Sequence, residues 1–221
     1  MGTGGVDMNY RTFDVEHWAR KEHYEYYTKQ LKVSYSITNP VDVTGLLSWC
    51  HKTEHKFYPM LIYHVTRVVN HLEFLRMFRK EDGTLCVWDE LSPNYTIFHK
   101  DDHTFSDCWT EYEEDMDAFY EKITKDMDVY GRKKGVKVKE GQPGNFYCIS
   151  AVPWIGYTGY ATNNMSGEPN FFPIITAGKY EGNDGKVKMP VTLTIAHAVC
   201  DGYHAGVFFE TLQKELDKYK I

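Results

Sequence analysis

His197 and Asp201 lie four residues apart in the stretch from Thr194 to His204, which reads Thr-Ile-Ala-His-Ala-Val-Cys-Asp-Gly-Tyr-His. The apolar run from Val191 to Ala196 predicts a buried strand, the Asp-Gly pair predicts a turn, and the residues that follow predict a helix. A neutral imidazole at the end of a buried strand can accept a proton from a substrate near neutral pH. The pattern therefore indicates a general-base site at His197.

The His-x-x-x-Asp-Gly pattern also has structural explanations. For an arbitrary pair, a core histidine before a turn aspartate is the commoner case, but the strand, turn and helix around this pair favour a site. A buried Asp carboxylate needs a partner for its charge, usually Arg, so Asp201 could lock the loop that aims His197. His204 could be a second base, although a helix-start residue without a chemical role is favoured. Cys200 could be a nucleophile, although a buried packing thiol is favoured.

The sequence lacks the patterns of several other site classes. The ten histidines do not follow metal-ligand spacings, and no glycine-rich nucleotide motif or Gly-x-Ser-x-Gly turn occurs, so we expect no metal, dinucleotide or serine nucleophile. The net charge of −6 argues against nucleic acid or an anionic membrane as a partner. Five cysteines without a Cys-x-x-Cys pair predict free thiols in a reducing cytoplasm. No apolar run approaches the ~20 residues of a membrane span.

The 221-residue chain, with 42% hydrophobic residues, can build one domain with a substantial core. We assign residues 8–221 to that domain and expect the Gly-rich residues 1–7 to be a disordered leader or tag. Strands and helices mix without regular βαβ alternation. This favours an α+β fold, a two-layer sandwich in which a mixed or antiparallel sheet is covered by helices.

Periodicity and turn signals give the expected elements. Helices are predicted at 14–29, 43–51, 60–72, 114–130 and 203–220, and strands at 33–38, 75–78, 84–88, 95–99, 104–109, 146–152, 172–180 and 188–196. Asp14 should cap the first helix, and Asn39-Pro40 should end the first strand. Residues 132–145 predict an exposed basic loop, for which a solvated surface is favoured over a phosphate site.

Seven segments in the same order, from about Met8 to the C-terminus, resemble the trimeric chloramphenicol acetyltransferase family. They are Phe13-Asp14-Val15 with Trp18 to His23; Lys56 to Pro59; Tyr95 to His99; Thr104 to Ser106; Ser150 to Trp154; Pro173 to Thr176 with Gly178 to Tyr180; and His197 to His204. Seven ordered matches are far more specific than the histidine motif alone.

The resemblance implies a coenzyme A-dependent acyltransferase fold and acetyl transfer from acetyl-coenzyme A to a hydroxyl of chloramphenicol. It implies direct attack in a ternary complex, without an acetyl-enzyme. On this basis His197 is the general base, and Asp201 pairs with Arg20 to hold the histidine loop. Thr176 would help to bind the tetrahedral transition state by way of a water molecule.

The resemblance also implies where the substrates bind. Positions that match the lining of the chloramphenicol pocket are Tyr26, Tyr27, Leu31, Tyr35 and Phe105. Positions that match the nucleotide end of coenzyme A are Lys56, Lys179 and Tyr180. Longer enzymes with this motif place the site between two similar halves, and a chain of this length supplies one half. The resemblance therefore implies a homotrimer with three sites at subunit interfaces.

Several positions differ from the common family pattern. Ala196 replaces the first of two consecutive histidines, Val33 replaces a cysteine of the acceptor pocket, and residues 161–163 replace an Asn-Leu-Asn sequence. Gly159 falls where a serine donor to the oxyanion is often found, and Thr158, a backbone N–H or a water could take its place. These differences leave the oxyanion donor and the acceptor selectivity open.

Two other functions remain as alternatives. The trimeric core of dihydrolipoyl acyltransferases uses the same histidine motif, but it is expected to follow a lipoyl domain and linkers. A non-catalytic small-molecule binder could keep the fold, but it would not need His197, Asp201 and Arg20 together. An acceptor-dependent release of coenzyme A thiol separates the three hypotheses.

Overall fold

A six-strand path forms the main sheet, as seen in the computed structural model, which describes residues 10–163 and 167–219. The strands, in spatial order, are β2 (Ser34–Asp42), β10 (Lys186–Ala196), β8 (Ile174–Gly178), β7 (Phe146–Val152), β5 (Ser92–Phe98) and β6 (Phe105–Trp109). β7 runs parallel to β5 and β8, and the other neighbours on this path are antiparallel. The short strand β9 (Glu181–Asn183) forms a hairpin with β10. The sheet is therefore mixed.

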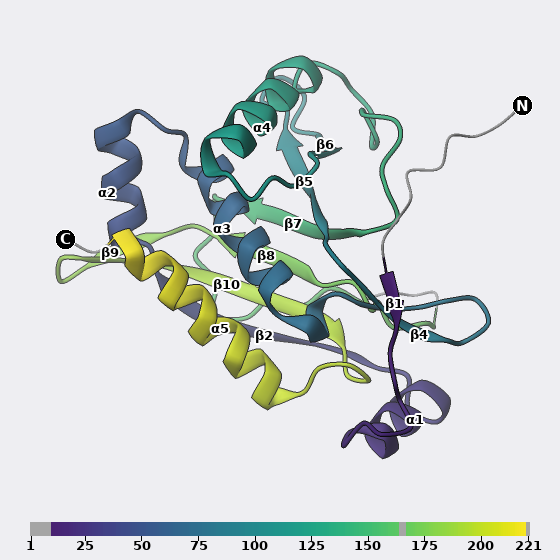
Figure 1. Cartoon of the computed structure of the whole chain (residues 1–221). Helices are drawn as coiled ribbons and strands as arrows, with labels where there is room; N and C mark the ends of the chain where they lie inside the picture. Colours follow the sequence, from purple (N-terminus) through teal and green to yellow (C-terminus); the bar gives the residue numbers. More distant parts are fainter. Residues whose placement is uncertain (1–9, 164–166, 220–221) are drawn as a thin grey trace, which may run out of the picture.

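Helices cover one face of this sheet (Figure 1). They are α2 (Thr44–Thr53), α3 (Phe57–His71), α4 (Met116–Tyr130) and α5 (Gly202–Leu216), and α1 (Lys21–Lys29) lies apart near the end of β10. A second, small sheet joins β1 (Tyr10–Thr12), β4 (Leu85–Trp88) and β3 (Met77–Arg79). The α+β two-layer prediction is confirmed. No helix within the described ranges is long and apolar enough to cross a membrane.

The two faces of the main sheet differ in chemistry. On the face beneath the helices, adjacent strands align apolar side chains in one row: Leu193, Ile175, Ile149 and Tyr95, each at most 1% exposed. The opposite face carries hydroxyls, because side chains alternate along a strand. Thr38 and Thr192 hydroxyls lie 2.7 Å apart, and those of Ser36 and Thr194 lie 2.6 Å apart. The second face is thus suited to polar contacts.

Two boundary predictions are wrong for local reasons. The first helix begins at Lys21 rather than after Asp14, since Asp14 accepts hydrogen bonds from the backbone and ring of His17 in a separate turn. The first strand continues through Asn39-Pro40 to Asp42. Pro40 is tolerated there because β2 is an edge strand of this chain, where a missing N–H removes no bond from a central ladder. Residues 1–7 lie outside the described part.

Glu215 links the two main helices. Its carboxylate lies 3.0 Å from His64 Nδ1 and 3.0 Å from Arg67 Nε, both on α3, and the side chain is 11% exposed. Burial by itself would raise the pKa of Glu215. Hydrogen bonds from His64 and Lys218 and the charge of Arg67 outweigh burial and lower the pKa to about 2. The ionised carboxylate is therefore the form that joins α3 to α5.

The Glu215 pairing predicts a specific loss of stability in acid. Because the folded-state pKa of about 2 lies below the ordinary 4.5, the carboxylate stabilises the fold above pH 4.5, and this is lost as the pH falls toward 2. The loss is about 3 kcal/mol. Urea unfolding of Glu215→Gln should depend less on pH than wild type across this window. Exposed Glu210→Gln is the matched control, and equal pH slopes in all three proteins would contradict the assignment.

Candidate active site

His197 follows the last residue of β10, at the end of the main sheet. Its backbone N–H donates to the Val33 carbonyl at 3.0 Å, which continues the pairing of β10 with β2. The imidazole stacks on Tyr27 with ring centroids 3.9 Å apart and lies 5.1 Å from the Tyr35 ring. Nδ1 is buried without a hydrogen-bond partner among the described residues. Nε2 is thus the ring nitrogen that can face a substrate.

Arg20 holds the turn that carries His197. Its guanidinium donates to the carbonyls of His197 at 3.2 Å and Ala198 at 3.3 Å, and its Nε lies 3.3 Å from Asp201 Oδ2. The contact between Arg20 and Asp201 that the sequence suggested is therefore present as an ion pair. Since the guanidinium is planar and rigid, one side chain can fix both carbonyls and the carboxylate at once. Among the described residues, Asp201 is linked to His197 through Arg20 and the backbone, without a direct contact between the two side chains.

Asp201 also caps α5. Its Oδ1 accepts from the backbone N–H groups of Tyr203 at 3.0 Å and His204 at 3.4 Å, and it lies 2.7 Å from His204 Nδ1. Burial by itself would raise the pKa of Asp201, but the His204 hydrogen bonds and the charge of Arg20 outweigh it, so the pKa is lowered. His204 thus orients the carboxylate of Asp201 and is separated from His197 by the turn.

Cys200 is a packing thiol in this structure. Its side chain is fully buried, and the Tyr35 hydroxyl donates to its Sγ at 3.4 Å. Burial raises the pKa of the Cys200 thiol to about 12. A neutral, enclosed thiol is a poor nucleophile. The arrangement therefore supports the packing interpretation over the nucleophilic one.

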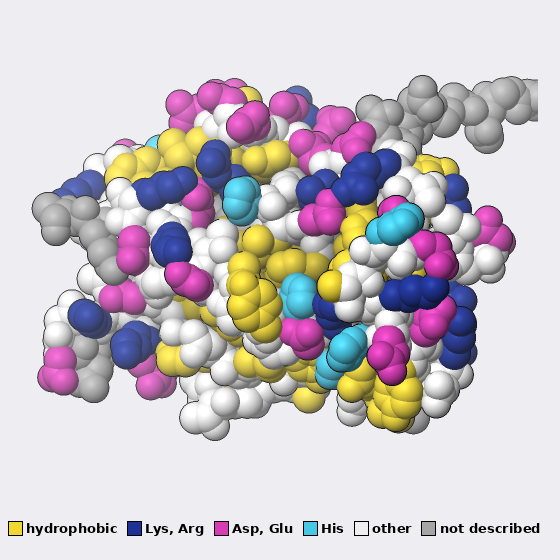
Figure 2. Space-filling model, turned by 60° about the horizontal axis from the view of Figure 1, so that its bottom comes forward, with side chains coloured by type: hydrophobic (Ala, Val, Ile, Leu, Met, Phe, Trp, Pro, Cys, Tyr) yellow, Lys and Arg dark blue, Asp and Glu magenta, His cyan; other side chains and the backbone are white. Residues whose placement is uncertain are grey.

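Aromatic and apolar side chains surround the open side of His197. Tyr27 and Tyr35 are half-buried against it, while Tyr26 and Leu31 are 42% and 45% exposed beside them on α1 and the following segment. Figure 2 views the molecule from the side that is at the bottom of Figure 1, and hydrophobic side chains lie next to histidine and acidic side chains near its centre. Four of the predicted acceptor residues thus lie near His197.

The structure does not bring Thr176 and Phe105 to His197 within one chain. Thr176 pairs with Thr192, five residues before His197 on β10, a separation of about 16 Å along the strand. Phe105 lies on β6, four strands away from β10, or about 19 Å across the sheet. Both lie on the hydroxyl-bearing face or its rim. One copy of the chain therefore holds the two parts of the predicted site at separate places.

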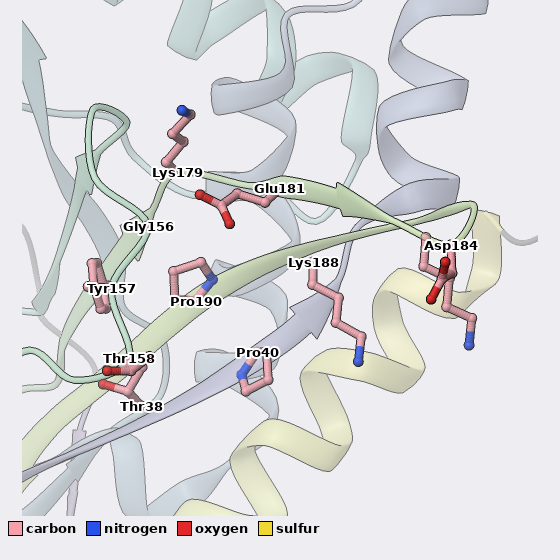
Figure 3. A pocket seen from close by; sticks show the side chains of 11 residues that line it. Thr38, Pro40, Gly156, Tyr157, Thr158, Lys179, Glu181, Asp184, Lys188 and Pro190 are labelled. Carbon is pink, nitrogen blue, oxygen red and sulfur yellow. The ribbon is translucent and has the colours of Figure 1, made fainter.

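The loop after β7 lies over the hydroxyl-bearing face (Figure 3). Tyr157 donates to the Thr176 carbonyl at 2.7 Å and lies beside Pro190 and Thr38 at the wall of a cavity of about 540 Å³. Gly159 is exposed in this loop, with open space where a side chain would begin. Thr176 instead has hydroxyl-bearing register partners on both sides, Thr192 on β10 and Ser150 on β7. The sequence motif contained Ser150, but only the register reveals this position.

Gly178 and Gly159 give opposite predictions for an added methyl group. A Cβ at Gly178 would lie 2.6 Å from ring atoms of both Tyr157 and Pro190, whereas at Gly159 nothing lies within 4 Å. Gly178→Ala should therefore cost about 1–3 kcal/mol of stability, because the Pro190 ring is rigid and Tyr157 is held by its hydrogen bond to the Thr176 carbonyl. Gly159→Ala should stay within ~0.5 kcal/mol of wild type. Urea unfolding midpoints measure both, and equal midpoints for the two variants would contradict the close packing of the loop.

A second cavity, of about 510 Å³, lies between α3 and the far ends of β5 and β7. Apolar and aromatic side chains line it, and Lys179 and Tyr180 border it. Tyr180 also contacts the Phe57 ring at 5.7 Å, which brings Lys56 to the same end of the molecule. The Tyr58 hydroxyl in its wall is buried without a hydrogen bond of normal geometry to the described residues. The cavity thus joins an apolar interior, a buried hydroxyl and surface cations.

This cavity opens where two strands separate. The parallel pairing of β5 with β7 ends at Tyr95 and Ile149, although both strands continue for three residues. Thr96 and Ser150 follow directly, with their hydroxyls 3.2 Å apart. Thr96 also lines the cavity. The helix-side cavity and the hydroxyl-bearing face therefore meet at this point of the sheet.

A sequence model of the chloramphenicol acetyltransferase family matches residues 8–213. The chain belongs to the chloramphenicol acetyltransferase family. Within it, the enzyme of Clostridium perfringens is 39% identical over 214 residues, which cover 96% of this chain and 97% of that protein. The enzyme of Clostridium butyricum is 38% identical over 207 residues, 94% of each chain. The protein is thus an acyltransferase enzyme.

Solved structures place the fold beside other acyltransferases. A chloramphenicol acetyltransferase aligns with a TM-score of 0.80 at 23% identity over 96% of this chain and 100% of that one. The truncated catalytic core of a 2-oxoacid dehydrogenase multienzyme complex from Thermoplasma acidophilum aligns with 0.66 at 16% identity, covering 93% and 97%. The coenzyme A-dependent acyltransferase fold expected for a chloramphenicol acetyltransferase is confirmed. In the part of the chain that is described, no cluster of His, Cys, Asp or Glu could hold a metal ion.

Proposed function

We propose that this enzyme transfers the acetyl group of acetyl-coenzyme A to a hydroxyl of chloramphenicol, which inactivates the antibiotic. The observation that carries the proposal is His197, half-buried at the end of β10 with its ring on Tyr27 and its turn held by Arg20. Two relatives of the protein, from Clostridium butyricum and Clostridium perfringens, are named chloramphenicol acetyltransferases. A preoriented imidazole beside aromatic side chains suits a base that works on an aryl-bearing alcohol.

The proposed chemistry needs one base and no covalent enzyme intermediate. His197 Nε2 accepts the proton of the acceptor hydroxyl while that oxygen bonds to the thioester carbonyl carbon. The carbon–sulfur bond then breaks, and the imidazolium returns the proton to the departing thiolate. The products are the acetyl ester and the free thiol of coenzyme A. The buried, protonated Cys200 supports direct transfer, because no other thiol lies in the His197 turn.

A second copy of the chain would complete each site. The hydroxyls of Thr176 and Ser150 are candidates to donate to the oxyanion, either directly or through a water molecule that they orient. Since Thr176 lies about 16 Å along the sheet from the His197 of its own chain, a symmetric neighbour can bring its hydroxyl face against His197. A homotrimer with three such interfaces satisfies this geometry.

The cavity between α3 and the sheet suits the acyl donor. A long, partly apolar arm fits a space of about 510 Å³ lined by Phe57, Leu61 and Trp154, and the Tyr58 hydroxyl offers it a hydrogen bond. Lys56 and Lys179 at the outer end can pair with phosphates. The separation of β5 from β7 gives the arm a route to Thr96 and Ser150. The described cysteines are all unpaired, which agrees with a reducing compartment such as the cytoplasm.

Release of coenzyme A thiol from acetyl-coenzyme A tests the proposed function. We expect release that depends on chloramphenicol and yields its acetyl ester by mass spectrometry. Dihydrolipoamide is the control acceptor for the alternative acyltransferase chemistry. Release with dihydrolipoamide but not with chloramphenicol would contradict the proposed acceptor and keep the acyl transfer.

A further inference from the structure

Asp107 ends a row of polar side chains that crosses the main sheet. The row follows the pairings of neighbouring strands on the face away from the helices: Thr38, Thr192, Thr176, Ser150, Thr96 and Asp107. Two of the five hydroxyls, those of Thr176 and Ser150, are the ones to which the proposed function assigns water or oxyanion binding. The other three lie next to them in the row. Asp107 supplies the negative charge of the row, on β6 directly opposite Thr96.

The carboxylate of Asp107 has no structural partner in the described ranges. The residue is half-buried, and its side chain makes no hydrogen bond or ion pair with residues 10–163 or 167–219. The cation whose charge acts on Asp107 is Lys137, which is exposed and forms a backbone β-bridge with Asp107. Burial raises the pKa of Asp107, and the charge of Lys137 opposes this effect. Leaving a partly buried carboxylate unpaired costs stability, which favours a role toward a ligand.

A structural carboxylate in the same region looks different. Asp126 on α4 lies 2.7 Å from Lys139 Nζ and 2.7 Å from the Thr110 hydroxyl, and its side chain is 14% exposed. Lys139 comes from the same loop as Lys137, yet it pairs with Asp126. The loop therefore satisfies one acid fully and leaves the other open toward the polar face.

Phe105 and Asp107 lie on the same face of β6, because they are two residues apart on one strand. Their Cα atoms are separated by about 7 Å, a distance that a para-substituted phenyl group spans. Phe105 is 56% exposed and matches a position that lines the acceptor pocket in the family. An aryl group packed on Phe105 can thus bring its para substituent to the Asp107 carboxylate.

We propose that Asp107 is an acceptor-recognition residue that selects aryl alcohols whose ring substituent donates a hydrogen bond. The inference rests on the proposed acetyl transfer. A carboxylate accepts from an amino or hydroxyl substituent, whereas a nitro group offers it no donor. The wild-type enzyme should therefore use the para-amino analogue of chloramphenicol at least as well as chloramphenicol itself, which carries a nitro group.

The ratio of kcat/KM for the para-amino analogue to that for chloramphenicol tests this role. Asp107→Asn should lower the ratio about tenfold, because the amide loses the charge but can donate to the nitro group. Asp102→Asn is the matched control, since Asp102 lies in the turn of the same hairpin and pairs with Lys134; its ratio should equal wild type. The melting temperature of Asp107→Asn should not fall, as it would if the carboxylate were structural.

An unchanged ratio in Asp107→Asn would overturn the recognition role while leaving the acetyl transfer intact. If wild type acetylates neither acceptor, the proposed function fails, and equilibrium binding of the two compounds by calorimetry then supplies the ratio instead. Equal effects of the substitution on both dissociation constants would also overturn the role. A ratio that falls only in the Asp107 variant supports it.

Discussion

His197→Ala should lower kcat for chloramphenicol acetylation by about 10³–10⁴-fold. The substitution removes the base, and no other titratable side chain occupies its place: His204 is engaged with Asp201, and Cys200 is a buried thiol. KM should change little, since Tyr26, Tyr27 and Tyr35 remain to bind the acceptor. Initial rates of thiol release, measured with saturating substrates, give kcat.

The His197 variant should remain folded. Its Nδ1 is a buried atom without a partner in the described structure, so loss of the ring removes no hydrogen bond from the fold. Circular dichroism and size-exclusion chromatography should therefore match wild type. His51→Ala, at an exposed position on α2, is the control for loss of a histidine. Near-normal turnover by His197→Ala would exclude the general-base role.

Asp201→Asn should lower stability and turnover together. The amide can still cap α5, so the variant isolates the loss of charge opposite Arg20. Because the Arg20 side chain is only 12% exposed, we expect a loss of about 1–3 kcal/mol. A turn that moves by less than 1 Å can misplace the imidazole, so kcat should fall about 10–100-fold with little change in KM.

The comparison with Arg20→Lys sharpens the Asp201 prediction. A lysine ammonium keeps the charge but cannot reach both turn carbonyls and the carboxylate, so this variant should show the same joint loss. Wild type should also lose the Asp201 contribution as the pH falls through its lowered pKa, and Asp201→Asn should not. An unchanged melting temperature with lost activity in Asp201→Asn would instead indicate a direct chemical role.

Local sequence signals predicted the strand that ends at His197 and several other elements of the fold. β10 carries apolar residues at alternate positions from Met189 to Ile195, and α4 has apolar residues at helical spacing with Gly131 at its end, so both formed close to the expected bounds. The strands that pair as β3 with β4 and as β5 with β6 were also expected from turn signals. The α1 boundary was missed because Asp14 bonds to His17 in a turn that resembles a helix start.

Features that depend on register could not be predicted. The sequence places Thr176, Ser150 and His197 in three motifs, but only strand pairing shows that the first two are adjacent and the third is remote. The sequence comparison with the family pointed to Gly159 as the position of a missing serine donor, whereas in the structure a side chain at Gly159 would meet only open space. Asp107 carries no motif, and its position opposite Thr96 becomes visible only in the assembled sheet.

The separation of His197 from Thr176 and Ser150 makes a mixed oligomer the most direct test of a shared site. One variant, His197→Ala, lacks the base, and a second, Ser150→Ala with Thr176→Ala, lacks the facing hydroxyls. The second should lose about 10²-fold or more in kcat. Each parent variant alone should therefore be impaired at every site.

Co-expression of the two variants with different affinity tags allows mixed oligomers to be isolated. If His197 of one copy works with the hydroxyls of its neighbour, each mixed trimer restores one of its three sites, because one interface joins the intact His197 of one variant to the intact hydroxyls of the other. We therefore predict thiol release well above that of either parent, at about a third of wild type. Activity in the mixed oligomers that stays at the average of the two parents would contradict the account, because each site would then be built from one copy.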